Sequence, residues 1–116
     1  MTKREPATKR NINIEGIRKA VTATRNALRS HFVFSEVYLF GSYAGGAVNR
    51  DSDIDLCFVS EKKVDAWEAQ IEVRKVIFDL LDTPLDILIY EKSQFYERAN
   101  QKSTMEYEIS HTGVLV

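Results

Sequence analysis

The stretch GSYAGGAVNRDSDID, residues 41–55, decides both the fold of this chain and the chemistry that it can support. It joins a Gly41-Ser42 pair, ten further residues and an Asp-x-Asp motif made by Asp53 and Asp55. A glycine lets a phosphate approach the backbone, and the free N–H groups of a helix that opens at Ser42 attract anions. Two neighbouring carboxylates can share a divalent cation. Neither motif is specific alone, but the combination favours phosphoryl or nucleotidyl transfer.

The apolar residues on both sides of this stretch alternate between helical and strand spacing. Helical spacing predicts helices from Ile14 to near His31 and from Val64 to Leu81, with short helices starting near Ser93 and Ser103. Short apolar runs predict strands at 37–40, 54–59 and 85–90. The order of these elements predicts an α/β fold, in which helices flank a small mixed β-sheet of three core strands.

Several side chains in these elements have expected structural roles. We expect Trp67 to pack on the broad apolar face of the long helix, and Ser60 to cap that helix. Ser103 and Glu106 have the spacing of a capping box. Tyr43, inside the opening stretch, either packs against the sheet or stacks on a nucleotide base.

Three acidic residues on two predicted strands form the candidate site. Side chains alternate along a strand, so Asp53 and Asp55 project to one side while Ile54 turns to the core. Carboxylates this close repel each other, and a divalent cation such as Mg²⁺ would compensate. Asp86 interrupts the otherwise apolar third strand, where a lone acid is costly unless it is paired or bound to metal.

The positions of these residues also predict the sheet topology. The long helix at 64–81 is suited to a right-handed crossover between parallel neighbours, which would bring Asp86 beside the Asp53/Asp55 pair. The first strand, in contrast, delivers Gly41 at its carboxyl end while the second strand begins beside Asp53. These two strands must therefore run antiparallel for Gly41 to reach the acids, which predicts a mixed sheet with a site at one end.

Composition limits the class of protein. The chain has 116 residues, 44% of them apolar and 28% charged, as expected for one globular domain. A formal net charge of -1 gives no strong attraction to nucleic acid or to anionic membranes, and no apolar stretch approaches the length of a membrane span. We expect residues 1–12 to be a flexible basic arm before a domain at 13–116, Cys57 to be a buried thiol, and the location to be cytoplasmic.

Taken together, these motifs resemble the nucleotidyltransferase superfamily that includes DNA polymerase beta, and the short chain is similar to its minimal prokaryotic branch. The resemblance implies a polymerase-beta-like fold in which Gly41 and Ser42 hold the triphosphate of ATP or another NTP. It also implies that Asp53 and Asp55 bind Mg²⁺, and that Asp86 completes the site as a metal ligand or as the base for an acceptor hydroxyl.

The chain departs from the family pattern at one position. Many relatives carry a basic residue just before the second glycine of the loop, where this chain has Gly45. Arg50 and Arg74 are the candidates to supply a positive charge to the phosphates. For Arg50, a role as a turn residue paired with Asp51 is an equal alternative.

Family members of this size resemble antitoxins that modify a tyrosine of a separately encoded HEPN ribonuclease with AMP, so the resemblance implies a protein adenylyltransferase with a HEPN partner. One alternative is a small-molecule nucleotidyltransferase of the antibiotic-modifying type, which would need a homodimer or another subunit to build its acceptor pocket. Another is a non-catalytic module that masks a toxin by contact. Nucleic-acid binding ranks last, because no interleaving of aromatic and basic residues is present.

Overall fold

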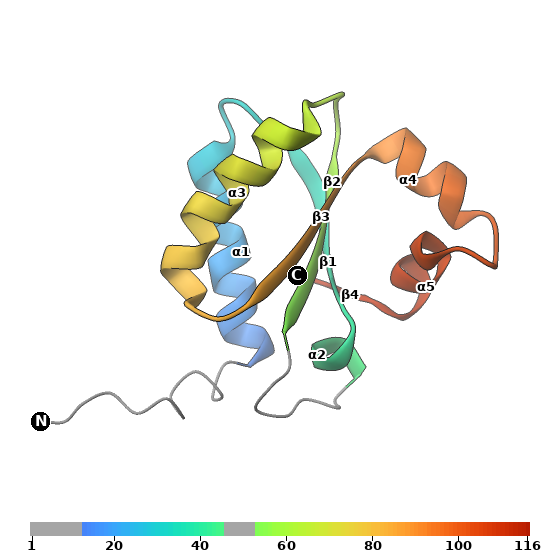
Figure 1. The fold of residues 1–116 in the computed structure, drawn as a ribbon, viewed down its shortest axis with the longest axis horizontal. Coiled ribbons are helices and arrows are strands. Elements are labelled where there is room, and N and C mark those ends of the chain that lie inside the picture. The colour runs from blue at the N-terminus through green and yellow to red at the C-terminus, as the bar shows by residue number, and fades with distance from the viewer. Residues whose placement is uncertain (1–12, 46–52) are drawn as a thin grey trace, which may run out of the picture.

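A computed structural model describes residues 13–45 and 53–116, and the predicted arm at 1–12 lies outside these ranges. Within them the chain forms one mixed four-stranded sheet in the order β3-β2-β1-β4, with helices on both faces (Figure 1). The elements in chain order are α1 (Ile14–Leu28), β1 (Phe34–Phe40), α2 (Ser42–Gly45), β2 (Ile54–Ser60), α3 (Ala66–Leu81), β3 (Leu85–Glu91), α4 (Lys92–Ala99), α5 (Met105–Thr112) and β4 (Val114–Leu115).

Strand directions agree with the prediction. β1 pairs with β2 in the antiparallel sense, and β2 pairs with β3 in the parallel sense through the α3 crossover. The short β4 adds antiparallel to the outer side of β1. The three expected core strands are therefore confirmed, and a two-residue fourth strand extends the sheet.

Two apolar clusters, one on each face, hold the helices on the sheet. Alternate residues of β2 point to opposite faces, so Ile54, Leu56 and Phe58 join the cluster under α1 and α3. Cys57 and Val59 join the second cluster, under α4 and α5. Burial, together with the nearby Glu106 carboxylate, raises the pKa of the Cys57 thiol to about 12, so the expected inert, buried cysteine is confirmed.

Helix α3 differs from the sequence expectation at Trp67. Its buried face is made by Ala69, Val73, Ile77 and Leu81, whereas Trp67 is 76% exposed. The expectation that Trp67 packs on this face is wrong, because α3 carries more apolar residues than the sheet and α1 can cover. The uncovered ones lie on its outer surface.

Two of the expected helix caps are also wrong. Ser60 is the last residue of β2, and its hydroxyl donates to the Lys62 carbonyl oxygen at 2.6 Å, while Asp65 caps α3 by accepting from the Glu68 N–H at 3.1 Å. Thr104 caps helix α5, because its hydroxyl accepts from the Tyr107 N–H at 3.1 Å. A side chain that forms an N-cap needs an extended backbone just before the helix, and here Asp65 and Thr104 supply it.

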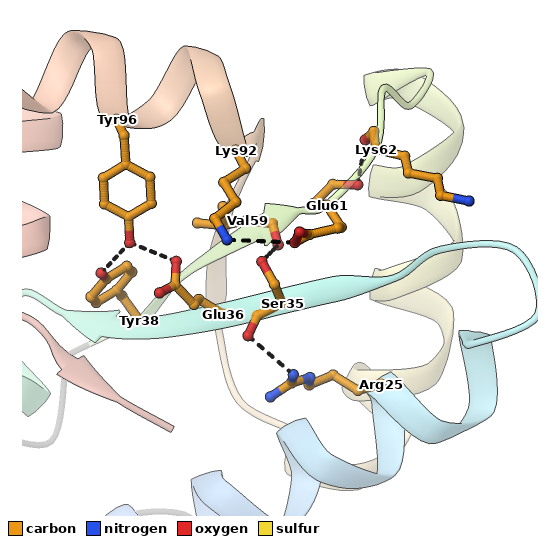
Figure 2. A network of polar contacts seen from close by, with 10 residues as sticks. Arg25, Ser35, Glu36, Tyr38, Val59, Glu61, Lys62, Lys92 and Tyr96 are labelled. Carbon is orange, nitrogen blue, oxygen red and sulfur yellow. Dashed lines mark hydrogen bonds and ion pairs between the residues drawn. The ribbon is translucent and has the colours of Figure 1, made fainter.

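A polar network ties helices from both faces to β1 (Figure 2). The Tyr96 hydroxyl on α4 donates to Glu36 Oε1 at 2.5 Å and lies 2.6 Å from the Tyr38 hydroxyl. From the other face, Arg25 on α1 donates to the Ser35 carbonyl oxygen at 3.3 Å. Burial and these hydrogen bonds raise the pKa of Tyr96, which keeps it protonated as a donor.

A second polar cluster fixes α5. Glu106, 4% exposed, accepts from the Tyr90 hydroxyl at 2.5 Å and from Arg98 Nε at 3.2 Å, so its carboxylate faces β3 and α4 instead of closing a capping box. Burial alone would raise the pKa of Glu106, but the hydrogen bonds from Tyr90 and Arg98 outweigh it and the pKa is lowered. None of the helices in residues 13–45 and 53–116 combines the length and the hydrophobicity that a membrane span requires.

We predict that Glu106→Ala lowers the free energy of unfolding by about 1–3 kcal/mol, because the Tyr90 hydroxyl loses its acceptor. Since the pKa of Glu106 is lowered in the fold, its stabilisation is present at neutral pH and is lost as the pH falls through the folded-state pKa. Urea unfolding at neutral and acidic pH measures both effects. Glu108→Ala, on the exposed side of α5, is the matched control, and equal losses in the two variants would contradict this role.

Candidate functional site

The strand register brings the predicted site residues together at one end of the sheet. Asp55 on β2 is paired with Asp86 on β3, and on its other side with Phe40, the residue before Gly41. Neighbouring strands lie about 4.8 Å apart, so Gly41, Asp55 and Asp86 form a short row across three strands. Helix α2 lies at this same end (Figure 1).

The row lies on the α4/α5 face of the sheet. Asp55 alternates with Leu56, which packs under α1 and α3, and it shares its face with Cys57. Asp86 likewise alternates with Ile87, which is buried on the α3 side. Asp53 and Asp86 are exposed and Asp55 is partly buried, so solvent and a ligand can reach all three carboxylates.

These carboxylates influence one another electrostatically. Burial raises the pKa of Asp55, and the negative charges of Asp86 and then Asp53 raise it further. None of the ion pairs within residues 13–45 and 53–116 involves any of the three. The site therefore holds like charges in proximity, which favours a cationic ligand.

Gly41 is required by both its conformation and its neighbour. Its φ of +75° lies in the left-handed region, which side chains disfavour. A Cβ atom at this position would overlap Asp55 Oδ2 and lie 3.1 Å from Asp55 Cγ. The Gly41 carbonyl oxygen accepts from the N–H groups of Ala44 and Gly45, both at 3.1 Å, so the chain enters α2 at this turn. The turn and the Asp55 carboxylate are thus in direct contact.

The other residues of the opening stretch are arranged as follows. Ser42, half-buried, is the first residue of α2. Tyr43 is 8% exposed and belongs to the cluster under α1 and α3, which confirms packing as its role. Gly45 is exposed, and a Cβ atom added there would meet no described atom within 4 Å. Arg50, the other expected phosphate contact, lies outside the described residues.

Arg74 makes its hydrogen bonds away from the site. Its Nε donates to Gln70 Oε1 at 2.9 Å, and its Nη1 to the Leu85 carbonyl oxygen at 3.4 Å. Gln70 in turn donates to the Ile87 carbonyl oxygen at 2.6 Å. Arg74 thus contacts the backbone next to Asp86 but lies on the α3 side of the sheet, and the geometry does not bring it to the acidic row.

The acidic row is not a closed metal cage. In the ranges that the structure describes, no group of three His, Cys, Asp or Glu side chains converges tightly enough to hold a metal ion by itself. Mg²⁺ needs only one or two carboxylates when water and phosphate oxygens complete its octahedron. The hard oxygen donors of Asp53 and Asp55, with the like-charge repulsion at Asp55, fit an ion that binds together with a phosphate-bearing substrate.

The sequence pattern does not single out Phe40, although the structure places it beside Asp55. Phe40 is half-exposed and packs against the cluster under α4 and α5. It therefore forms an apolar border of the acidic row on the side of β1. The signal available in the sequence is alternation, because Phe40 lies two residues after Tyr38 and faces the same way.

The sequence is similar to nucleotidyltransferases in two comparisons with known proteins. Residues 21–111 match the family model of the nucleotidyltransferase domain. The chain is 30% identical over 78 residues to the protein adenylyltransferase MntA of Thermococcus cleftensis, an alignment that covers 67% of this chain and 78% of that protein.

Two solved structures share the fold. A crystal structure from Sulfolobus solfataricus, described as a candidate nucleotidyltransferase, has a TM-score of 0.54 at 22% identity and covers 99% of this chain and 89% of that one. A crystal structure of a toxin-antitoxin with AMP-PNP has a TM-score of 0.56 at 24% identity and covers 90% of this chain and 72% of that one.

We predict that Gly41→Ala destabilises the fold by about 1–3 kcal/mol, because the new side chain meets both an unfavourable φ and the Asp55 carboxylate. Gly45→Ala, four residues away in the same turn and with no described atom close to the new Cβ, should change stability by less than about 0.5 kcal/mol. Thermal unfolding of the two variants checks the difference. Similar melting temperatures for both would show that the Gly41 turn does not depend on glycine.

Proposed function

The chain belongs to the nucleotidyltransferase domain family and is a nucleotidyltransferase, and we propose that it moves AMP from ATP onto an acceptor hydroxyl. One observation carries the proposal: the pairing of β1, β2 and β3 sets the Gly41 turn against Asp55 and sets Asp86 beside Asp55 on the next strand. A phosphate-binding turn and clustered carboxylates are the two parts that nucleotidyl transfer requires.

In this proposal Asp53 and Asp55 hold Mg²⁺, with Asp86 as a further ligand or as the base. When bound, the ion supplies positive charge to the phosphates and orients the α-phosphate. It would also offset the repulsion that raises the pKa of Asp55. Asp53 and Asp55 can contribute one carboxylate each because they lie two residues apart on the same side of the chain.

Residues of this chain also bind the phosphates and accept the proton in the proposed reaction. Gly41 and Ser42 hold the β- and γ-phosphates, because Gly41 has no side chain to obstruct them and Ser42 offers a hydroxyl and a helix N-terminus. The acceptor oxygen attacks the α-phosphorus in line, the bond to the bridging oxygen breaks, and pyrophosphate leaves. As the base, Asp86 takes the proton of the acceptor hydroxyl, for which its exposed carboxylate is accessible.

The acceptor in this proposal is a tyrosine hydroxyl of a HEPN-domain protein. Asp53 and Asp86 are open to solvent, so the described chain forms no enclosed pocket over them and a protein partner can present a side chain. Support comes from the relative named protein adenylyltransferase and from the toxin-antitoxin structure with AMP-PNP. A tyrosine side chain is long enough to reach a carboxylate row from a partner's surface.

We predict transfer of label from α-labelled ATP onto a HEPN-domain protein in the presence of Mg²⁺, and its loss when the metal is removed with EDTA. Asp53→Asn and Asp55→Asn should each lower the transfer rate by about 100-fold or more, because each removes a carboxylate proposed to hold the ion. Glu108→Gln, an exposed acid on α5, is the control and should retain the wild-type rate. Equal labelling by Asp53→Asn and wild type would exclude this mechanism.

Asp86→Asn should separate stability from activity. Because the Asp86 charge raises the pKa of Asp55, ionised Asp55 is disfavoured in the fold. That penalty is absent at acidic pH, grows as the pH rises from the unfolded-state pKa to the raised folded-state pKa, and is complete above it. The variant should therefore be more stable than wild type by roughly 0.5 kcal/mol at neutral pH without metal, with no gain at acidic pH, while label transfer falls. Thermal unfolding with EDTA at both pH values measures the effect, and a loss of stability at neutral pH would contradict it.

A further inference from the structure

Helix α3 carries an exposed apolar stripe on the outer side of the molecule. Trp67, Ile71 and Phe78 are 76%, 42% and 55% exposed. Spacings of four and seven residues place them in one line along a helix that turns about 100° per residue. We call these three residues the α3 stripe. An uncovered apolar surface of this kind, rimmed by charged residues, is typical of an interaction site.

A pocket of about 490 Å³ lies at the Phe78 end of the stripe, and we call it the Phe78 pocket. It is formed where the last turns of α3 meet the start of β3. Its lining residues are Arg74, Lys75, Phe78, Asp79, Thr83, Pro84 and Leu85. The stripe therefore has a large exposed side chain, Trp67, at one end and a hollow at the other.

The spacing along the stripe is the same when read in either direction. From Trp67 through Ile71 and Arg74 to Phe78 the steps are four, three and four residues, which is also the spacing of a helix–helix seam. Arg74 fits this line because its guanidinium is held by Gln70 and the Leu85 carbonyl oxygen, which leaves its aliphatic part for packing. The line is symmetric about the point between Glu72 and Val73.

We propose that two copies of this chain pair through the α3 stripe in antiparallel orientation. A two-fold axis through the midpoint places Trp67 of each copy opposite Phe78 of the other. Within one copy these two residues are about 16 Å apart along the helix, so the interface has two such contacts, one at each end. Each Trp67 enters the Phe78 pocket of the other copy. A two-fold interface is self-complementary, and the stripe supplies both the protruding side chain and the hollow that it fills.

Charges beside the stripe agree with the same axis. Glu68 and Lys75 lie on one flank of the stripe, 4.5 and 2.5 residues on either side of its midpoint. The two-fold axis therefore brings Glu68 of each copy to the same flank as Lys75 of the other, offset by two residues or about 3 Å along the helix. Both side chains are long enough to span this offset, which gives two ion pairs. Among the described residues of one copy, Lys75 has an ion pair with Glu72 at 3.7 Å on the surface, and such a pair contributes little to stability.

The pairing leaves the acidic row free. Helix α3 packs on one face of the sheet, and α4 and α5 lie on the other (Figure 1). Asp55 and Asp86 project on the α4/α5 face, because they alternate with Leu56 and Ile87 of the cluster under α3. The inference is therefore independent of the proposed transfer reaction. Either one can fail without the other.

Trp67 is the only tryptophan of the chain and reports directly on the interface. We expect analytical ultracentrifugation of the wild-type chain to show a dimer that dissociates on dilution, with a blue shift of tryptophan emission as the concentration rises.

Phe78→Ser removes a wall of the pocket but keeps the reporter, and should raise the dimer dissociation constant by about 100-fold or more. Leu80→Ser changes a residue of α3 that is 49% exposed but lies off the stripe, and should leave the dimer intact.

A charge exchange tests the orientation. Lys75→Glu and Glu68→Lys should each weaken the dimer, and the double variant should restore it, with circular dichroism confirming the fold of every variant. A wild-type chain that stays monomeric with unshifted emission would overturn the proposal, as would a dimer insensitive to Phe78→Ser or a double variant without rescue. A monomeric chain whose Trp67 emission shifts only when a HEPN-domain protein is added would assign the stripe to that partner and would also overturn it.

Discussion

The double pairing of β2 is the constraint on which the rest of the structure depends. An antiparallel neighbour on one side and a parallel neighbour on the other deliver Gly41 and Asp86 to the same end of the sheet as Asp55. If β1 ran parallel to β2, Gly41 would lie at the far end, about 20 Å away. The apolar clusters on both faces hold β2 in this register, so the core directly positions the acidic row.

The parts of the fold that follow from local pattern could be predicted from the sequence. The strand at 54–59 and the row of Gly41, Asp55 and Asp86 follow from alternation, crossover handedness and the position of each motif. The predictions that failed concern side chains whose environment is set by residues far away in the sequence. Glu106 has the spacing of a cap, but Tyr90 and Arg98 bind its carboxylate, and only the packing of α4, α5 and β3 brings these groups together. Trp67 fits an apolar face, but periodicity does not tell how much of that face the sheet and α1 cover.

The two faces of the sheet are specialised in different ways. The α4/α5 face carries polar and charged groups, from the acidic row at one end to the Tyr38, Tyr96 and Glu36 contacts farther along β1. The opposite face is apolar, and its outermost helix still exposes a line of large side chains. A nucleotide and a protein surface can therefore be bound on separate sides, and the like-charge repulsion at Asp55 is tolerated because apolar packing beneath β2 is extensive.

The hydrogen bonds from Gln70 and Arg74 have a consequence for how this protein behaves at high concentration. β3 is the last strand on its side of the sheet, and the Pro84 carbonyl oxygen turns inward to accept from Ile54, so those of Leu85 and Ile87 turn outward. Unpaired carbonyl groups on an outer strand are a template for another chain's strand and a route to aggregation. Arg74 and Gln70 occupy these two acceptors, which protects the apolar strand that carries Asp86 against amyloid-like growth.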